Sequence, residues 1–296
     1  RRAAITVDAA IQWLDGLEPG EQFFCWVHFY DPHAPYDPPE EYRQRFPTDP
    51  YTGEIAYMDA EIGRLLEHLE QRGLLEDTFV AAIGDHGEAF SEHGEQTHAI
   101  LLHQATLRVP WIMAGPGLPS RARLNVPVST SDAAPTLAEL AGASLPADEL
   151  EGVSLVDLLR GEVQPYVDRS LYAETMLPRF QYGWSPLRLI RRNRWELVSG
   201  TRDELFDLRR DPRELVDVLD REAGTGTDLA RQLGDIAARD SDPSVSEAKT
   251  SISVSEREKL QALGYLGTEA APRDEAPDPR DLIGGHVHME RARALS

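Results

Sequence analysis

The sequence predicts an α/β domain with a mostly parallel central sheet, followed by a small α+β region with an antiparallel sheet. Three observations indicate this fold. An apolar, β-branched run at residues 78–84 is typical of a buried parallel strand, and polar residues follow it directly. The strongest helical pattern, at residues 53–73, lies between this run and an earlier strand-like run at residues 22–30. Short strands separated by polar turns begin near residue 170.

In chain order, residues 6–17 carry apolar side chains at helical spacing and predict the first helix. Residues 22–30 are dense in aromatic and β-branched side chains and predict a buried strand that ends in a proline-rich loop. Strand, helix and strand together make a βαβ crossover, which should be right-handed. Further strands are expected at residues 109–114 and 126–128.

The second half begins with a helix that Ser131 and Asp132 cap and that extends to Ala141. A shorter helix at residues 154–159 is closed by a glycine. A meander then follows, with a tight turn at Arg192 and Asn193. Its strands are predicted at residues 171–174, 187–191, 195–199 and 204–208, and a helix at residues 227–238 should back them.

Beyond residue 240 the chain is rich in Ser, Asp and Pro, which is typical of linkers. A capping box at Ser255 and Glu258 predicts a short helix between two such linkers, and another helix should begin after residue 281. We therefore predict three regions: catalytic α/β residues 1–165, a small antiparallel-sheet subdomain at residues 166–239, and a linker leading into a helical region at residues 240–296.

Composition excludes several classes of protein. Hydrophobic residues make up 41% of the chain, enough for a substantial core. The formal net charge of -21 argues against nucleic acid as a partner, and it means that an anionic ligand would need a local cation. No run approaches the length of a membrane span, and the single cysteine, Cys25, allows no intramolecular disulfide. Arg1 starts within a helical pattern, which suggests a fragment.

Chemistry is expected in the first third of the chain, because seven of the nine histidines precede residue 104. Asp85 and His86 directly follow the strand at residues 78–84, at the sheet edge where α/β folds place their sites. A loop cap is the plainer interpretation of Asp85, but the attached His86 and Gly87 favour a metal-ligand pair. His33 follows the other strand and either lines a pocket or fixes its proline-rich loop. His98, as an imidazolium, would supply the local cation.

The other histidines have plainer interpretations. His28, inside a strand, is predicted to be a buried core residue, and His68 a solvated residue on the polar side of its helix. His93 and His103 are expected at the surface or behind the metal ligands. Cys25, also within the strand, is interpreted as a small core residue.

Several motifs in one order make the chain resemble the sulfatase family of the alkaline-phosphatase-like superfamily. They are Tyr-Asp-Pro-His-Ala-Pro-Tyr at residues 30–36, Gly-Asp-His-Gly-Glu at 84–88, and His98 followed by Arg-Val-Pro at 108–110. Weaker matches extend the resemblance to about residue 220. The run at residues 260–267 resembles bacterial sulfatase-like proteins in which tetratricopeptide repeats follow, so a protein partner could bind a downstream repeat region.

This resemblance implies a metal-dependent hydrolase of aryl or carbohydrate sulfate esters, exported or periplasmic by family tendency. Asp85 and His86 match part of its metal site, which usually holds calcium; because imidazole also suits manganese or zinc, those ions remain alternatives. His33 and His98 match residues that contact the sulfate.

The chain departs from the family at the nucleophile. A formylglycine is made there from the first residue of a Cys-x-Pro-x-Arg motif, and the sequence has no such motif; Gly117 to Arg121 copies only its tail. The upstream acidic metal-ligand pair is also missing. We therefore expect the C-terminal part of a sulfatase, inactive alone. Two alternatives are a phosphatase, phosphodiesterase or phosphonate hydrolase of the same superfamily, and a non-catalytic fragment or scaffold module.

Overall fold

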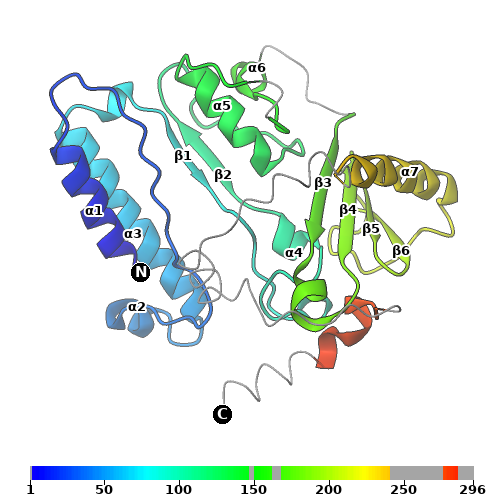
Figure 1. Ribbon diagram of the computed structural model, residues 1–296. Coiled ribbons are helices and arrows are strands. Elements are labelled where there is room, and N and C mark those ends of the chain that lie inside the picture. The colour runs from blue at the N-terminus through cyan, green and yellow to red at the C-terminus, as the bar shows by residue number, and fades with distance from the viewer. Residues whose placement is uncertain (1, 147–149, 162–167, 241–275, 286–296) are drawn as a thin grey trace. The chain divides into compact units, whose positions relative to one another are not determined.

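The computed structural model describes residues 2–146, 150–161, 168–240 and 276–285 (Figure 1). The chain divides into two compact units, Arg1–Ala81 with Met113–Leu118, and Ala82–Ile112 with Pro119–Ser296. Helices and sheets occur together, so the predicted α/β class is confirmed. The predicted region limits at residues 165 and 239 stay a prediction. Among the described helices, none has both the length and the apolar character that crossing a bilayer requires.

The first unit is built on two helices that lie side by side, α1 (Ala3–Asp15) and α3 (Pro50–Gln71) (Figure 1). The buried residues of α1 recur at helical spacing and form one face: Ala3, Val7, Ala10 and Leu14. Helix α3 starts three residues earlier than predicted, because the Asp49 side chain accepts the Thr52 N–H at 3.0 Å and caps it. The short helices α2 (Glu40–Arg45) and η1 (Leu75–Asp77) complete this unit.

The predicted buried strand at residues 22–30 is wrong. None of the strands that the structure describes pairs with this segment. The segment is extended, and every second side chain along it is exposed. Phe24 and Trp26 are 77% and 84% exposed. Composition favoured a strand here, but a strand also needs a neighbour that accepts and donates its backbone hydrogen bonds.

Strands β1 (Val80–Ile83) and β2 (Trp111–Ala114) form a two-stranded sheet at the positions predicted for residues 78–84 and 109–114. The limit between the two units falls within both strands. Just beyond β1, the Gly84 N–H donates to the Pro110 carbonyl at 3.1 Å, so the strand end is fixed where the polar motif begins. No strand is found at residues 126–128.

The second unit contains helices η3 (Thr130–Asp132), α5 (Ala133–Leu140) and α6 (Val156–Arg160). Asp132 does cap the chain here, but through a capping box with Ser129 at the start of η3 rather than at the start of α5. Its carboxylate is fully buried and also binds Arg169 through two hydrogen bonds, of 2.6 and 2.7 Å. Helix α6 ends at Gly161, whose φ of 74° favours glycine.

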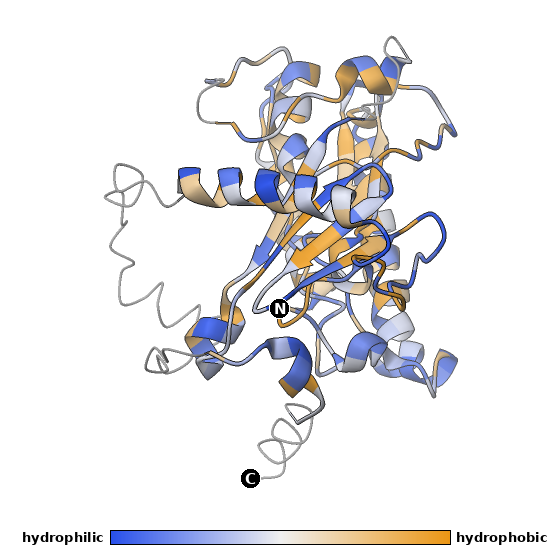
Figure 2. Cartoon of the chain, turned by 90° about the vertical axis from the view of Figure 1, so that its right-hand side faces the viewer, coloured by the Kyte–Doolittle hydropathy of each residue, from blue (hydrophilic) through white to orange (hydrophobic). Residues whose placement is uncertain are grey.

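A four-stranded antiparallel sheet dominates the second unit, in the order β3-β4-β5-β6. Its strands agree with the predicted meander to within one or two residues: Ser170–Thr175, Leu187–Arg192, Trp195–Ser199 and Asp203–Asp207. Helix α7 (Ala223–Asp240) covers one face of the sheet, where Leu229 and Leu233 join a buried cluster. Figure 2 shows the apolar strands of the sheet behind this amphipathic helix.

The other face of the sheet is covered by residues 100–107, which include helix α4 (Gln104–Leu107), and by residues near Ile283. Residues 276–285 are tied to the sheet by Asp278, which accepts from Thr201 and Arg280. Burial alone would raise the pKa of Asp278, but these hydrogen bonds hold it well below its usual range. The predicted helix at residues 255–263 and most of the predicted linkers lie outside the described residues, whereas residues 276–280, predicted as the end of the second linker, are held against the sheet.

Candidate active site

Asp85 and His86 emerge from the end of β1 as predicted. The Asp85 side chain is 75% exposed, and its Oδ1 accepts the backbone N–H of His86 at 3.0 Å. His86 donates from Nδ1 to the Gly87 carbonyl at 2.9 Å, which leaves Nε2 as the acceptor nitrogen of the neutral ring. Nε2 lies 3.9 Å from Asp85 Oδ1. A histidine whose other nitrogen is fixed by a carbonyl is the usual form of a metal ligand, so the pair fits a shared cation.

His98 lies directly against this pair. Its ring stacks on that of His86, with centroids 3.9 Å apart and an interplanar angle of 26°. Nδ1 of His98 is 3.0 Å from Oε1 of Glu88, whose side chain is only 5% exposed. A buried carboxylate therefore fixes the orientation of the ring. Glu88 belongs to the Gly-Asp-His-Gly-Glu motif, but nothing in the sequence marks it for this contact.

The loop between Glu88 and His98 returns on itself. Ala89 N–H donates to the Thr97 carbonyl and Ser91 N–H to the Glu95 carbonyl, both at 2.8 Å. The buried Glu95 side chain accepts the backbone N–H groups of Ile100 and Leu101 at 2.7 and 3.2 Å. Burial raises the pKa of Glu95 despite these bonds. This carboxylate anchors the chain just after His98, and nothing local in the sequence marks it for that role.

Gly87 permits a close backbone approach that the site depends on. Its N–H donates to the Thr106 carbonyl at 2.7 Å, and a Cβ added at Gly87 would come within 2.3 Å of the Ala105 carbonyl oxygen. Any side chain there must push α4 away from the motif.

We expect Gly87→Ala to destabilise the protein by about 1–3 kcal/mol, the usual range for overpacking. The midpoint of urea denaturation measures this. Gly63→Ala is the control, because open space surrounds Gly63 within α3 and alanine favours a helix. Equal stability of Gly87→Ala and wild type would show that the close approach is not real.

His33 belongs to the first unit, whereas Asp85, His86 and His98 belong to the second. Within the second unit, the structure thus brings together three of the four predicted site residues. Nδ1 of His33 donates to the Ala34 carbonyl at 2.7 Å, and its ring stacks on Tyr30. Its backbone N–H donates to the buried Glu54, at 3.2 Å. Burial raises the pKa of Glu54, a loop-fixing residue that the sequence did not reveal.

The remaining predictions are mixed. His28 is exposed, not buried, because none of the strands that the structure describes pairs with its segment. His68 is only 20% exposed, and its Nε2 lies 3.0 Å from Asp15 Oδ1. His103 is buried, and His93 is intermediate. Cys25 is half-buried, and burial raises the pKa of its thiol, the opposite of what a nucleophilic cysteine needs.

Two family models match the chain. The sulfatase family model matches residues 3–143, and the model of the C-terminal region of N-sulphoglucosamine sulphohydrolase matches residues 92–238. The chain belongs to the sulfatase family. Both models include the loop that carries His93 and His98.

Among curated sulfatases, the choline-sulfatase of Rhizobium meliloti is 34% identical over 59% of this chain and 33% of its own length. The Delta 4,5-hexuronate-2-O-sulfatase of Bacteroides thetaiotaomicron is 30% identical over 65% of this chain and 40% of its own. This sulfatase chain therefore spans about a third to two fifths of the length of these relatives.

Two solved structures share the fold. A 2-O GAG sulfatase matches with a TM-score of 0.64 and 19% identity, over 95% of this chain and 70% of that one. The phosphonate monoester hydrolase of Agrobacterium radiobacter matches with a TM-score of 0.68 and 22% identity, over 80% of this chain and 60% of that one.

Proposed function

We propose that this chain is part of a metal-dependent sulfuric ester hydrolase. The observation that carries the proposal is the grouping of Asp85 Oδ1, His86 Nε2 and the stacked His98 ring at the end of β1. A carboxylate and an imidazole nitrogen would hold a divalent cation, and a second imidazole beside them would meet the anion that the cation attracts. The names of the curated relatives support sulfate esters, carbohydrate ones among them, as substrates.

Each side chain has a separate part in this proposal. Asp85 and His86 would hold the ion, which would neutralise charge on the sulfate oxygens. Calcium is the ion that the family implies, although the imidazole of His86 also suits manganese or zinc. His98 would donate from Nε2 to a sulfate oxygen while Glu88 holds Nδ1. For His33, contact with the sulfate stays a prediction from the sequence.

The sulfuryl group also needs a covalent acceptor, and none of the 296 residues matches the family's nucleophile motif. We therefore expect the purified chain to hydrolyse no activated aryl sulfate at an enzymatic rate, even with calcium or manganese added. Asp85 and His86 supply two ligands where calcium takes roughly six to eight. The exposure of Phe24 and Trp26 should in addition favour aggregation.

The assay compares the chain with its Asp85→Ala variant at matched metal concentrations. Background rates in both agree with this proposal. Metal-dependent turnover that Asp85→Ala abolishes would show that the nucleophile lies within these 296 residues and that we have not recognised it.

A phosphonate or phosphate ester hydrolase is the second candidate, and the likeness to the phosphonate monoester hydrolase supports it. The two candidates share the metal-holding residues and differ in the nucleophile. Parallel assays separate the two candidates. They compare hydrolysis of an aryl sulfate, an aryl phosphate and a phosphonate monoester, with the form of the protein that hydrolyses such esters. A non-catalytic module would bind metal but leave all three esters intact.

A further inference from the structure

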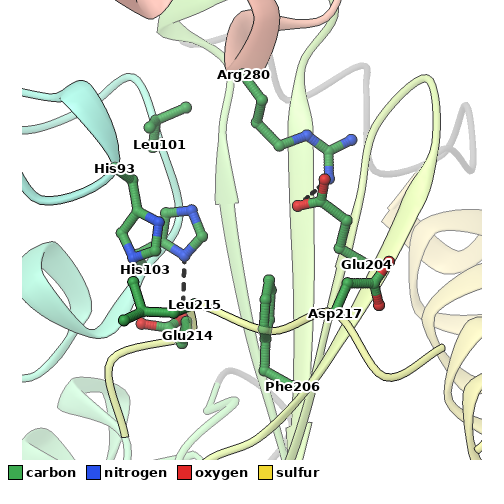
Figure 3. Close-up of a pocket in the computed structure, with 9 residues that line it drawn as sticks. All are labelled: His93, Leu101, His103, Glu204, Phe206, Glu214, Leu215, Asp217 and Arg280. Atoms are coloured by element: carbon green, nitrogen blue, oxygen red, sulfur yellow. Dashed lines mark hydrogen bonds and ion pairs between the residues drawn. The ribbon is translucent and has the colours of Figure 1, made fainter. Parts of the chain in front are cut away.

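Another polar cluster lies in the second unit and shares no residue with the candidate active site. His93, His103 and Glu214 each offer a ligand atom, and these atoms all lie within 4.8 Å of one another. The two imidazole rings stack, with centroids 3.6 Å apart and an interplanar angle of 12°. They line a cavity of about 250 Å³, which Figure 3 shows beside Phe206 and Glu204.

His103 is held in one orientation by buried carboxylates. Its Nδ1 donates to Glu214 Oε1 at 3.1 Å, and Glu214 Oε2 accepts the Gln104 N–H at 2.8 Å. Glu196 is fully buried on the sheet near Glu214. Its Oε1 accepts no hydrogen bond from an N–H group of the described residues. Burial, and then the nearby Glu214, raises the pKa of Glu196 well above its usual range.

Glu214 keeps its charge for reasons that the contacts explain. Burial alone would raise its pKa, but the hydrogen bonds from His103 and Glu196 outweigh burial and hold the pKa below its usual range. His103 Nδ1 and Glu214 Oε1 lie 3.1 Å apart with one proton between them. When that proton moves to Nε2 of His103, Nδ1 becomes an acceptor, and an ion can bind Nδ1 and the Glu214 carboxylate together.

His93 brings a second imidazole from a distant loop. It lies in η2 (Glu92–Gly94), and its Nε2 donates to the Arg213 carbonyl at 3.1 Å, which leaves Nδ1 as the acceptor. Burial, and then the neighbouring His103, lowers the pKa of His93, the direction that favours the neutral ring a metal ligand needs. His93 and Glu214 both adopt left-handed backbone conformations, with φ of 52° and 54°. Such strain in residues other than glycine concentrates at functional positions.

We propose that His93, His103 and Glu214 bind a transition-metal ion of the Zn²⁺ type, distinct from the cation at Asp85 and His86. Two neutral imidazoles and a carboxylate are a ligand set that zinc uses, and the cavity leaves room for water at an open position. Zinc ligands lie ~3.4 Å apart in a tetrahedral site, so binding would draw these donors closer by a turn of the His93 ring, which borders the cavity. The ion would tie the loop that leads to His98 to the segment after β6.

Zinc binding is measured by isothermal titration of the purified chain with ZnCl₂ at pH 7.5. The background carries Asp85→Asn and His86→Ala, which remove the ligands of the candidate active site, so the result is independent of sulfate ester hydrolysis. We expect one equivalent of zinc to bind in this background. His93→Ala and His103→Gln should each raise the dissociation constant at least about 10-fold, and Glu214→Gln about 10- to 100-fold.

His68→Ala is the matched control, because His68 also faces a carboxylate, Asp15, but belongs to no cluster of metal-binding side chains among the described residues. A His286→Ala/His288→Ala variant tests the His-x-His pair near the end of the sequence. Neither should change the affinity. Circular dichroism without metal checks folding, and His93→Ala, at a half-buried position, remains decisive if His103→Gln unfolds. The absence of zinc binding in the background, unchanged affinity in His93→Ala, or loss of binding only in the control variants would each overturn the proposal.

Discussion

Replacing Asp85 by asparagine should lower kcat/KM for a sulfate ester by about 10²–10³-fold, the usual cost of removing one charge-stabilising group from an active site. Asparagine retains the oxygen that accepts the His86 N–H at 3.0 Å, so the strand end should keep its structure. What disappears is the negative charge that would hold the cation. The measurement uses the form of the protein that turns over sulfate esters, with calcium or manganese titrated.

The control for this variant is Asp77→Asn, because Asp77 lies in η1 ahead of β1 rather than after it. Asp77→Asn should retain wild-type kcat/KM and metal affinity. His86→Ala should show the same loss as Asp85→Asn, and combining the two should cost little more, because residues that act as a unit are not additive. If Asp85→Asn kept its activity within a few-fold of wild type, these residues would not hold the catalytic ion.

The sheet in the second unit could be predicted from sequence because its signals are local. Strand β5 (Trp195–Ser199) matches its prediction at both ends, since the turn at Asn193 sets the residue at which it begins. The segment at residues 22–30 has the same kind of composition and yet forms no strand. A strand depends on a partner, which composition within one segment does not reveal.

The same distinction applies to the site. Asp85 and His86 are adjacent and follow a strand, so sequence alone could place them together. His98 lies beside Asp85 and His86 because its ring Nδ1 donates to Glu88. Glu88 is only ten residues earlier in the chain, so this contact is still a local one. Glu214 lies 111 residues from His103, and only the folded sheet brings the two together. The cluster around His103 was therefore beyond local sequence reasoning.

Breaking the buried pair of Asp132 and Arg169 should have the largest effect on stability. Asp132 is fully buried, and its oxygens accept two bonds from Arg169 and the backbone N–H groups of Ser129 and Val153 at 2.8 and 2.9 Å. Asp132→Asn leaves the guanidinium of Arg169, 19% exposed, without its counter-charge. Removing one partner of a buried ion pair commonly costs about 3–5 kcal/mol.

Urea denaturation gives the free energy of unfolding, and an unchanged m-value shows that the loss arises from stability alone. Asp168→Asn is the control, because Asp168 directly precedes Arg169 in the sequence but forms an exposed ion pair instead. Its side chain is 84% exposed and lies 3.6 Å from that of Arg192. An exposed pair of that kind contributes at most about 1 kcal/mol. Replacing both partners, as Asp132→Asn with Arg169→Leu, should cost less than the sum of the single variants, because no unpaired charge remains. A loss below about 1 kcal/mol in Asp132→Asn would mean that capping, rather than the ion pair, is the main contribution of Asp132.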